Sequence, residues 1–512
     1  MSYFDDPSAN WNRRFAWLCA GVFVFRVLFT LFFCAHADLA GDEAYYWDWG
    51  RRPDWGYYSK PPMIGWLMGL VGWLTGACDI GVRMTALVMG TMTLGVIFLL
   101  MQRLYDARTG FIAAVLLLLT PANTGLNLFL TIDAPLLLSW SLALLLFWWA
   151  VEKPSCWTRW LALALVMGLG SLSKQMMLVF PVLMVAFLAF DAERRAILRN
   201  PRLWVSILIG AAFLTPVVLW QQRHEWITLE HTAHHFNAES LGFGRWLTRT
   251  LEWPGVQALV YSPGLTAAMV LVLWLGLRGW RGMAARERYL LMASAPALIA
   301  FSALALRQRI NPNWPAVFWL PALLLVAAWF AGHLPWSGMI AWRRWSLRVA
   351  AALVVAAHLL IPAVFLTSLR GHKKLAELRG WEETGQQAGA FLDKAPRPDH
   401  TFVMALGHRY HAAQMAFSMP QNPRVYRWEP SGHPMSQYEI WPGAEERIGD
   451  DGLILGSGSV PAPVAACFAS VEKLGKIEVP LGKKTRAYDV FLGRGLKSWP
   501  PPPVVKKEVA KP

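Results

Sequence analysis

Three carboxylates stand beside long apolar runs of the sequence. Asp42 and Glu43 follow the first run, and Asp133 is flanked by apolar residues at the start of another. A carboxylate next to hydrocarbon needs a cation or a water-filled cavity. A positioned carboxylate can also take a proton from a hydroxyl nucleophile, so all three are candidate catalytic residues. The alternatives are a solvated turn for Asp42 and Glu43, and a helix N-cap with Pro135 in the first turn for Asp133.

Basic and amide side chains lie near the ends of other apolar runs. Lys60 precedes two prolines, and an ammonium on such an extended segment suits a phosphate. Lys174 lies between two short runs, where it either binds a phosphate or extends to the lipid headgroups. Arg307, Arg309 and Asn313 could hold a phosphate or a sugar, although arginines at span ends are common without that role. The candidate phosphate ligands are therefore Lys60, Lys174, Arg307 and Arg309.

The elements that must position these residues are membrane helices. The chain has 512 residues, of which 55% are hydrophobic and 16% charged, and its mean hydropathy is +0.34. That is too apolar for a soluble enzyme. Hydrocarbon about 30 Å thick takes roughly 20 helical residues, and apolar runs of about that length recur. We predict about eleven transmembrane helices, near residues 15–36, 81–102, 109–128, 131–150, 158–173, 176–190, 203–220, 255–277, 288–306, 314–332 and 346–368.

The distribution of basic residues predicts the orientation. The net charge of +15 arises largely from short loops on one side, with arginines such as Arg13, Arg194, Arg199 and Arg286. Loops rich in lysine and arginine stay cytoplasmic. We therefore expect a cytoplasmic N-terminus and an outer C-terminal domain, and no nucleic-acid partner.

The longer segments define the domains. Residues 1–369 form the transmembrane module, and its first outer loop, 37–80, contains an apolar stretch from Met63 to Thr75 that suits an interfacial helix. Hydropathy falls after residue 370, and short strand and helix patterns predict a small α/β domain over 370–496. Residues 497–512, rich in proline and lysine, read as a disordered tail.

Neither the cysteines nor the histidines indicate a metal site. The five cysteines show no metal-ligand spacing. The second long outer loop holds His224, Glu225, His231, His234 and His235, but no further ligand is suitably spaced. We expect no metal and no other cofactor, although a divalent metal is compatible with the sequence.

Several motifs together resemble the GT-C superfamily of membrane glycosyltransferases, in the branch of protein O-mannosyltransferases and lipid A aminoarabinose transferases. In sequence order they are Asp42-Glu43, the Tyr-Tyr-Ser-Lys-Pro-Pro segment 57–62, Thr131 to Pro135, Asn311 to Pro315, Pro423 to Tyr426 and Ser436 to Tyr438. The resemblance implies a GT-C fold and a sugar donor linked to a polyprenyl phosphate, used at the outer face of a bacterial inner membrane. It also implies that Asp42 is the catalytic base and that Lys60 contacts the donor phosphate.

Two positions depart from the aminoarabinose transferases. Ser59 stands where they have an acidic residue, which puts a metal site using that acid in doubt. Tyr45 stands where they have an arginine, so the donor sugar is expected to differ. The candidate substrate-binding residues are Tyr45, Tyr57, Tyr58 and Asn313.

The function that these observations favour is inverting transfer of one sugar from a polyprenyl phosphate to lipid A, lipopolysaccharide, another glycolipid or a protein. The alternative is a transporter or lipid flippase. Carriers usually place ionisable residues near mid-membrane and show internal repeats, whereas the notable charges here lie at one face. A structural assembly factor would leave Asp42, Lys60 and Asp133 without a purpose.

The loop charges make the topology testable. Reporter fusions at Arg199 and Lys394 should report opposite sides of the membrane, because only the first lies in an arginine-rich loop. Compartment-specific phosphatase and fluorescence signals measure this. Signals from the same side would refute the orientation.

Overall fold

The computed structural model describes residues 10–234, 242–336, 340–366, 376–482 and 484–500. They form two compact units. Unit 1 comprises residues 1–30, 83–220 and 232–360, and unit 2 comprises 31–82, 221–231 and 361–512. The first outer loop therefore groups with the C-terminal domain. The predicted boundary at 369/370 and most of the predicted tail lie outside the described residues, so the predicted domain limits stay predictions.

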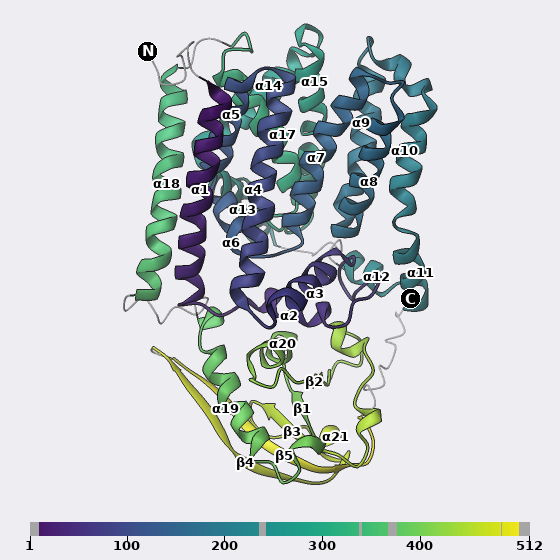
Figure 1. Cartoon of the computed structure of the whole chain (residues 1–512), viewed down its shortest axis with the longest axis vertical. Coiled ribbons are helices and arrows are strands. Elements are labelled where there is room, and N and C mark those ends of the chain that lie inside the picture. The colour runs from purple at the N-terminus through teal and green to yellow at the C-terminus, as the bar shows by residue number, and fades with distance from the viewer. Residues whose placement is uncertain (1–9, 235–241, 337–339, 367–375, 483, 501–512) are drawn as a thin grey trace. The chain divides into compact units, whose positions relative to one another are not determined.

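Unit 1 is built from helices (Figure 1). They are α1 (Trp11–Cys34), α4 (Asp79–Leu104), α5 (Ala107–Leu118), α6 (Pro121–Leu128), α7 (Asp133–Glu152), α8 (Trp157–Ser173), α9 (Val179–Phe190), α10 (Pro201–Ala212), α11 (Thr215–Arg223), α13 (Phe243–Tyr261), α14 (Pro263–Arg278), α15 (Ala285–Met292), α16 (Ala295–Ala305), α17 (Ala316–Phe330) and α18 (Ile340–Leu366). Each of the predicted spans overlaps one or two of these helices.

The number of membrane crossings is a separate question. Among the described residues, 6 helices are long and apolar enough to cross a membrane, or up to 8 if each bent pair is one span. The bent pairs are α5 with α6, at 75°, and α13 with α14, at 110°. A proline begins the second helix of each pair, at Pro121 and Pro263, and proline is favoured at that position. Other predicted spans are shorter apolar helices, including α9 and α17, so the count of eleven stays a prediction.

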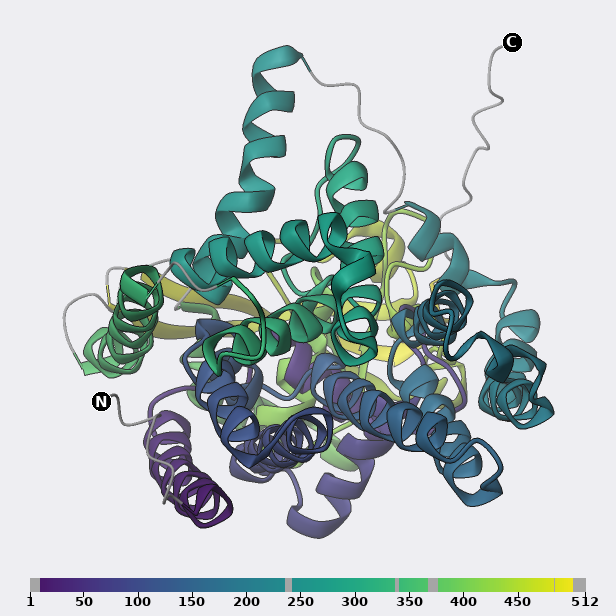
Figure 2. The same cartoon turned by 90° about the horizontal axis from the view of Figure 1, so that it is seen from above.

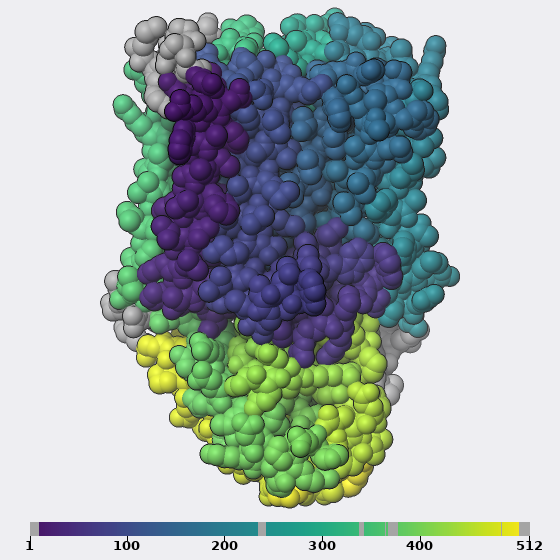
Figure 3. Space-filling model, in the orientation of Figure 1, coloured from purple at the N-terminus to yellow at the C-terminus, as the bar shows by residue number. Residues whose placement is uncertain are grey.

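The surfaces of α1 and α18 suit contact with lipid. Phe29 of α1 lies 4.9 Å from His358 of α18, measured between ring centroids, and the two helices stand together at one side of unit 1 (Figure 2). Only 17% of the apolar window of α1 and 11% of that of α18 is buried. Large apolar side chains such as Trp17 and Leu359 are exposed. Figure 3 shows this outer face of α1 in purple.

One guanidinium lies inside the helices of unit 1. Arg26 on α1 is buried, and it donates hydrogen bonds to the side-chain oxygens of Asn127, at 2.8 Å, and Asn123 on α6. An arginine in hydrocarbon must find acceptors within the protein. These amides supply them and join α1 to α6.

Unit 2 combines short helices with one sheet. Its helices are α2 (Gly41–Gly50), α3 (Met63–Thr75), α12 (Ile227–His234), α19 (Trp381–Asp393), α20 (Arg409–Ser418) and α21 (Ala462–Ala465). Its strands are β1 (Thr401–Ala405), β2 (Val425–Arg427), β3 (Asp451–Gly456), β4 (Phe468–Leu481) and β5 (Lys484–Leu496), in the order β2-β1-β3-β5-β4. Strand β1 is parallel to β2 and β3, and β5 is antiparallel to β3 and β4. The predicted small α/β domain is confirmed.

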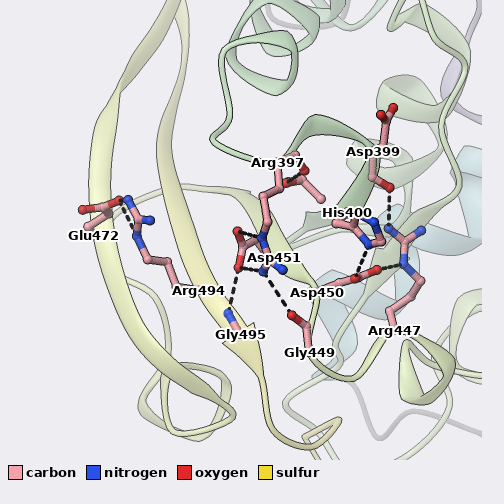
Figure 4. A network of polar contacts seen from close by, with 11 residues as sticks. Arg397, Asp399, His400, Arg447, Gly449, Asp450, Asp451, Glu472, Arg494 and Gly495 are labelled. Atoms are coloured by element: carbon pink, nitrogen blue, oxygen red, sulfur yellow. Dashed lines mark hydrogen bonds and ion pairs between the residues drawn. The ribbon is translucent and has the colours of Figure 1, made fainter.

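Unit 2 is held together by tight helix packing at one place and by hydrogen bonds at another. Gly50 of α2 meets Gly69 of α3 so tightly that a Cβ atom on Gly50 would lie 2.3 Å from the Gly69 nitrogen. At the sheet, Asp451 at the start of β3 accepts hydrogen bonds from Arg397 and from the Gly495 nitrogen of β5, both at 2.8 Å (Figure 4). Burial alone would raise the pKa of Asp451, but these donors hold it below its usual value. An ionised Asp451 therefore ties β3 to β5.

Candidate functional site

Asp42 stands in the first turn of α2, and its neighbour Glu43 builds that turn. The Glu43 carboxylate accepts a hydrogen bond from the Ala40 nitrogen at 3.0 Å, at the position where an acidic residue satisfies the free backbone donors of a helix start. Glu43 is fully buried, whereas Asp42 is half-buried. The pair is therefore not a fully solvated turn: the structure gives Glu43 a capping role and leaves Asp42 more open.

Tyr410 holds the Asp42 carboxylate. Its hydroxyl donates to Asp42 Oδ1 at 2.8 Å. Burial, and then the charge of Asp42, raises the pKa of Tyr410 to about 12, so the phenol stays protonated and keeps donating. The ring also packs against Gly41, where a Cβ atom would lie 2.5 Å from Tyr410 Cγ. Asp42 Oδ2 accepts no hydrogen bond from any described residue, so only Oδ1 of this carboxylate is bonded within the described part of the chain.

Arg409 supplies a positive charge beside the same carboxylate. Its guanidinium lies 5.0 Å from the Tyr410 ring centroid and 5.5 Å from that of Tyr45. Such cation–π contacts stabilise by about 0.5–2 kcal/mol. Arg409 is thus held close to Asp42 without a direct ion pair in the described structure.

The aromatic residues of the first outer loop are packed. Tyr45 is 2% exposed, and its hydroxyl accepts a hydrogen bond from the Gln437 nitrogen at 2.5 Å. Gln437 in turn accepts one from the Tyr58 nitrogen at 2.6 Å. Tyr57 is fully buried and stacks on Trp49 with 4.4 Å between ring centroids. These contacts give the tyrosines a structural role, and their contact with substrate stays a prediction.

Lys60 lies on the turn that leads into α3. Its carbonyl oxygen accepts a hydrogen bond from the Tyr57 nitrogen at 3.1 Å, and its side chain is half-buried. Pro61 and Pro62 follow directly, and Pro62 is the N-cap of α3. Lys60 and Asp42 both belong to unit 2.

The candidates in unit 1 form a second cluster. Lys174 Nζ lies 2.8 Å from Asp133 Oδ1, and the Asn313 amide donates to Asp133 Oδ2 at 2.6 Å. Asp133 is 5% exposed and Lys174 8% exposed. A carboxylate at this depth needs a cation, and Lys174 provides it. Asp133 begins α7, but the N-cap residue is Ile132 and makes no side-chain capping bond.

The two arginines near residue 310 follow the end of α16, and one of them lies beside a cavity. Arg307 and Arg309 are exposed, and Arg309 pairs with Glu252 of α13 at 2.6 Å. Arg309 lines a cavity of about 170 Å³ that is also lined by Gln257 and Gln308. Gln257 Oε1 and Gln308 Nε2 are buried and have no hydrogen-bond partner among the described residues. The cavity can therefore accept a polar group, and sequence reasoning did not select either glutamine.

Sequence reasoning also missed Arg409 and Tyr410. They sit in the run His408-Arg409-Tyr410-His411 between β1 and the body of α20. Polar and aromatic residues at the start of a helix after a strand are a site signal in α/β folds. The contact with Asp42 spans 368 residues of sequence, so no local pattern reveals it.

The described part of the chain contains no cluster of metal-ligating side chains. No group of at least three His, Cys, Asp or Glu side chains there could hold an ion. His231 packs against Tyr58 with 4.7 Å between ring centroids, and His235 lies outside the described residues. The expected absence of a metal stays a prediction.

Comparisons with known proteins give the class. Residues 59–220 match the family model described as dolichyl-phosphate-mannose-protein mannosyltransferase. A lipid A galacturonosyltransferase of Rhizobium johnstonii is 28% identical over 416 residues, covering 78% of this chain and 82% of the relative. An undecaprenyl phosphate-alpha-4-amino-4-deoxy-L-arabinose arabinosyl transferase of Pseudomonas aeruginosa is 26% identical over 62% of this chain and 46% of its own length.

A solved structure shares the fold. The crystal structure of ArnT from Cupriavidus metallidurans in the apo state matches with a TM-score of 0.64 at 15% identity, and covers 94% of this chain and 98% of that chain. The same protein bound to undecaprenyl phosphate also gives a TM-score of 0.64. The comparisons support a glycosyltransferase, and the relatives and the shared fold are similar to membrane glycosyltransferases of the GT-C superfamily. The fold of the chain is of the ArnT type.

The buried ion pair of unit 1 predicts an asymmetry between single and double variants. Lys174→Met leaves Asp133 buried without its cation, so we expect a loss of about 3–5 kcal/mol in stability. Asp133→Asn with Lys174→Met removes both charges and should be clearly more stable than Lys174→Met alone. Thermal unfolding in detergent measures both.

The exposed pair is the matched control. Arg309→Met breaks the pair with Glu252, and because Arg309 is 73% exposed its loss should cost at most about 1 kcal/mol. The two single variants, Asp133→Asn and Lys174→Met, each lose some stability. If the double variant lost as much stability as the two losses added together, the pair would not act as a unit.

Proposed function

We propose that the protein transfers one sugar from a polyprenyl-phosphate-linked donor to a lipid A, lipopolysaccharide, glycolipid or protein hydroxyl at the periplasmic face of the inner membrane, with inversion. Asp42 is the general base, and the reaction uses no nucleotide and no cofactor. The observation that carries this proposal is the Asp42 carboxylate, held through one oxygen by Tyr410 at 2.8 Å with the other oxygen open.

The chemistry follows from that arrangement. The acceptor oxygen attacks the anomeric carbon, its proton passes to Asp42 Oδ2, and the electron pair of the breaking C–O bond leaves with the polyprenyl phosphate. Attack opposite the leaving group inverts the anomeric centre. A neutral hydroxyl is a poor nucleophile, and a positioned base contributes about 10² to 10⁴ in rate. The hydrogen bond from Tyr410 holds the Asp42 carboxylate in one orientation during the proton transfer.

The donor assignment rests on the chain's basic residues and on its relatives. Lys60 lies on a proline-fixed turn in unit 2, together with Asp42. An ammonium there suits the phosphate of a lipid donor. The relative of the same fold has been solved with undecaprenyl phosphate. Arg307 and Arg309 remain candidate phosphate ligands because both are exposed, although Arg309 pairs with Glu252, whereas Lys174 is buried in its pair with Asp133.

Lipid A is the acceptor that the comparisons favour. The relative that matches over 82% of its own length is named for transfer to lipid A. Transfer there requires an outward-facing Asp42, in agreement with the loop charges, which predict a cytoplasmic N-terminus. The remaining acceptors, including protein, are resolved by assaying transfer to each from a synthetic polyprenyl-phosphate sugar.

Asp42→Asn tests the base. It keeps the size of the side chain and the hydrogen bond from Tyr410 but cannot take the proton, so transfer should fall at least about a hundredfold while donor binding survives. Radiolabelled sugar transfer in proteoliposomes measures the rate. Tyr410→Phe should lose less, because the base remains, and Asp399→Asn, at an exposed position of the outer domain, should match the parent.

Near-parental transfer by a folded Asp42→Asn variant would remove Asp42 from the mechanism. Glu43 would then be the next carboxylate to examine, although Glu43→Gln also weakens the start of α2.

Lys60→Ala tests the donor contact. Loss of the ammonium should raise the apparent KM for the lipid donor or lower kcat, since it removes a charge that attracts the phosphate. Lys60→Arg keeps the charge and should retain much of the activity, and Lys394→Ala, at an exposed position, is the control. Parental KM and kcat in Lys60→Ala would show that Lys60 does not bind the donor.

A further inference from the structure

The outer part of unit 2 contains a cavity that none of the predicted site residues lines. Its volume is about 390 Å³, at the lower end of the range of about 300–1,000 Å³ for small-molecule sites. It lies beyond β2, and its lining includes Trp428, Glu429, Glu439, Trp441, Glu445 and Trp499. Such a cavity is large enough for a small ligand such as a sugar ring.

Aromatic side chains supply flat walls. Trp441 lies edge-on to Tyr438, with 5.5 Å between ring centroids, and the Arg52 guanidinium covers its ring at 4.1 Å. Trp499 packs beside Tyr426 at 5.6 Å. Rings fixed in this way present large apolar faces at little conformational cost. The C–H face of a pyranose packs well against such a surface.

Carboxylates outnumber cations in the lining. Arg427 pairs with both Glu429 and Glu439, and its side chain is 6% exposed. Burial alone would raise the pKa of Glu429, but Arg427 holds it below its usual value, so Glu429 stays ionised. Among the described residues of the lining, Glu445 is a third carboxylate and His433 is the one other basic residue. Burial raises the pKa of Glu439, and Arg427 opposes this shift only in part, so Glu439 contributes less negative charge than Glu429. The remaining excess of carboxylates attracts a cation and repels an anionic sugar.

One buried donor in the lining lacks an acceptor. Trp428 is 8% exposed, and its indole Nε1 has no hydrogen-bond partner within the described part of the chain. A buried donor left unsatisfied costs about 1–3 kcal/mol. Trp428 lines the cavity, so a ligand hydroxyl that reached this N–H would accept that hydrogen bond.

We propose that the cavity is a second carbohydrate-binding site, which holds one sugar ring bearing a protonated amino group. The aromatic walls hold the ring, the Trp428 N–H donates to a ring oxygen or hydroxyl, and the carboxylates pair with the ammonium. The site binds without reacting, so it does not rest on the proposed transfer function.

Binding of simple glycosides to the full-length protein in nanodiscs tests the site. Saturation-transfer NMR should show saturable binding of methyl glucosaminide, with roughly tenfold weaker binding of methyl glucoside and none of methyl glucuronide. A tenfold change corresponds to about 1.4 kcal/mol, a reasonable value for one partly desolvated ion pair. Equal binding of the three glycosides, or none of the glucosaminide, overturns the proposal.

Variants keep the test specific. Glu445→Gln changes an exposed carboxylate of the lining and should weaken glucosaminide binding several-fold, whereas Glu446→Gln, next to it but bonded to Arg424 outside the lining, should not. Trp428→Phe keeps a large ring and removes only the N–H, and should also weaken binding. Equal affinities in Glu445→Gln and Glu446→Gln overturn the proposal.

Two further measurements distinguish a lipid-borne sugar from a soluble one, and separate binding in the cavity from transfer at Asp42. Nanodiscs carrying a glucosamine-headed glycolipid that lower the apparent affinity for free glucosaminide support the site and identify a lipid headgroup as its ligand. An unchanged affinity supports a soluble saccharide instead. Asp42→Asn should bind glucosaminide as the parent does, so loss of transfer with retained binding is a property of Asp42 alone.

Discussion

The cost of placing charge beside hydrocarbon governs the polar architecture of this protein. Asp133 pairs with Lys174 at 2.8 Å, Asp191 pairs with Arg288 at 2.9 Å, and Arg26 is bonded to two asparagines. Breaking a buried pair typically costs about 3–5 kcal/mol. Each buried charge therefore depends on its partner, and the helices that carry the partners are fixed to one another.

Asp42 differs from these paired carboxylates, and the difference is functional in our account. One oxygen is held by a phenol that stays protonated, and the other is open. A base must be fixed in place without being neutralised, because an ion pair that occupied both oxygens would remove its capacity to accept a proton. Glu43 caps the start of α2. In our account Glu43 therefore has the structural role and its neighbour Asp42 the chemical one.

Much of the fold follows from local sequence. Apolar runs located the membrane helices, the stretch Met63 to Thr75 is observed as α3 with those bounds, and short strand and helix patterns after residue 370 predicted the small α/β domain. The bends of 75° and 110° were not predicted, since periodicity alone does not show where α5 and α13 stop before Pro121 and Pro263. The candidate carboxylates were visible because charge is rare beside apolar runs. Lys174 was selected as a phosphate ligand, but its pairing with Asp133 was not predicted, and neither was the contact of Tyr410 with Asp42. Contacts between distant segments leave no local pattern.

The central claim is that Asp42 removes the acceptor's proton, and acceptor acidity tests it most directly. The measurement is the single-turnover rate of sugar transfer by the parent and by Asp42→Asn, with acceptors made progressively more acidic by fluorine next to the reacting hydroxyl. The account predicts that the deficit of Asp42→Asn shrinks as the acceptor becomes more acidic, because less help is needed to remove the proton. A deficit that stays constant across the series would contradict the account and leave Asp42 with a positioning role.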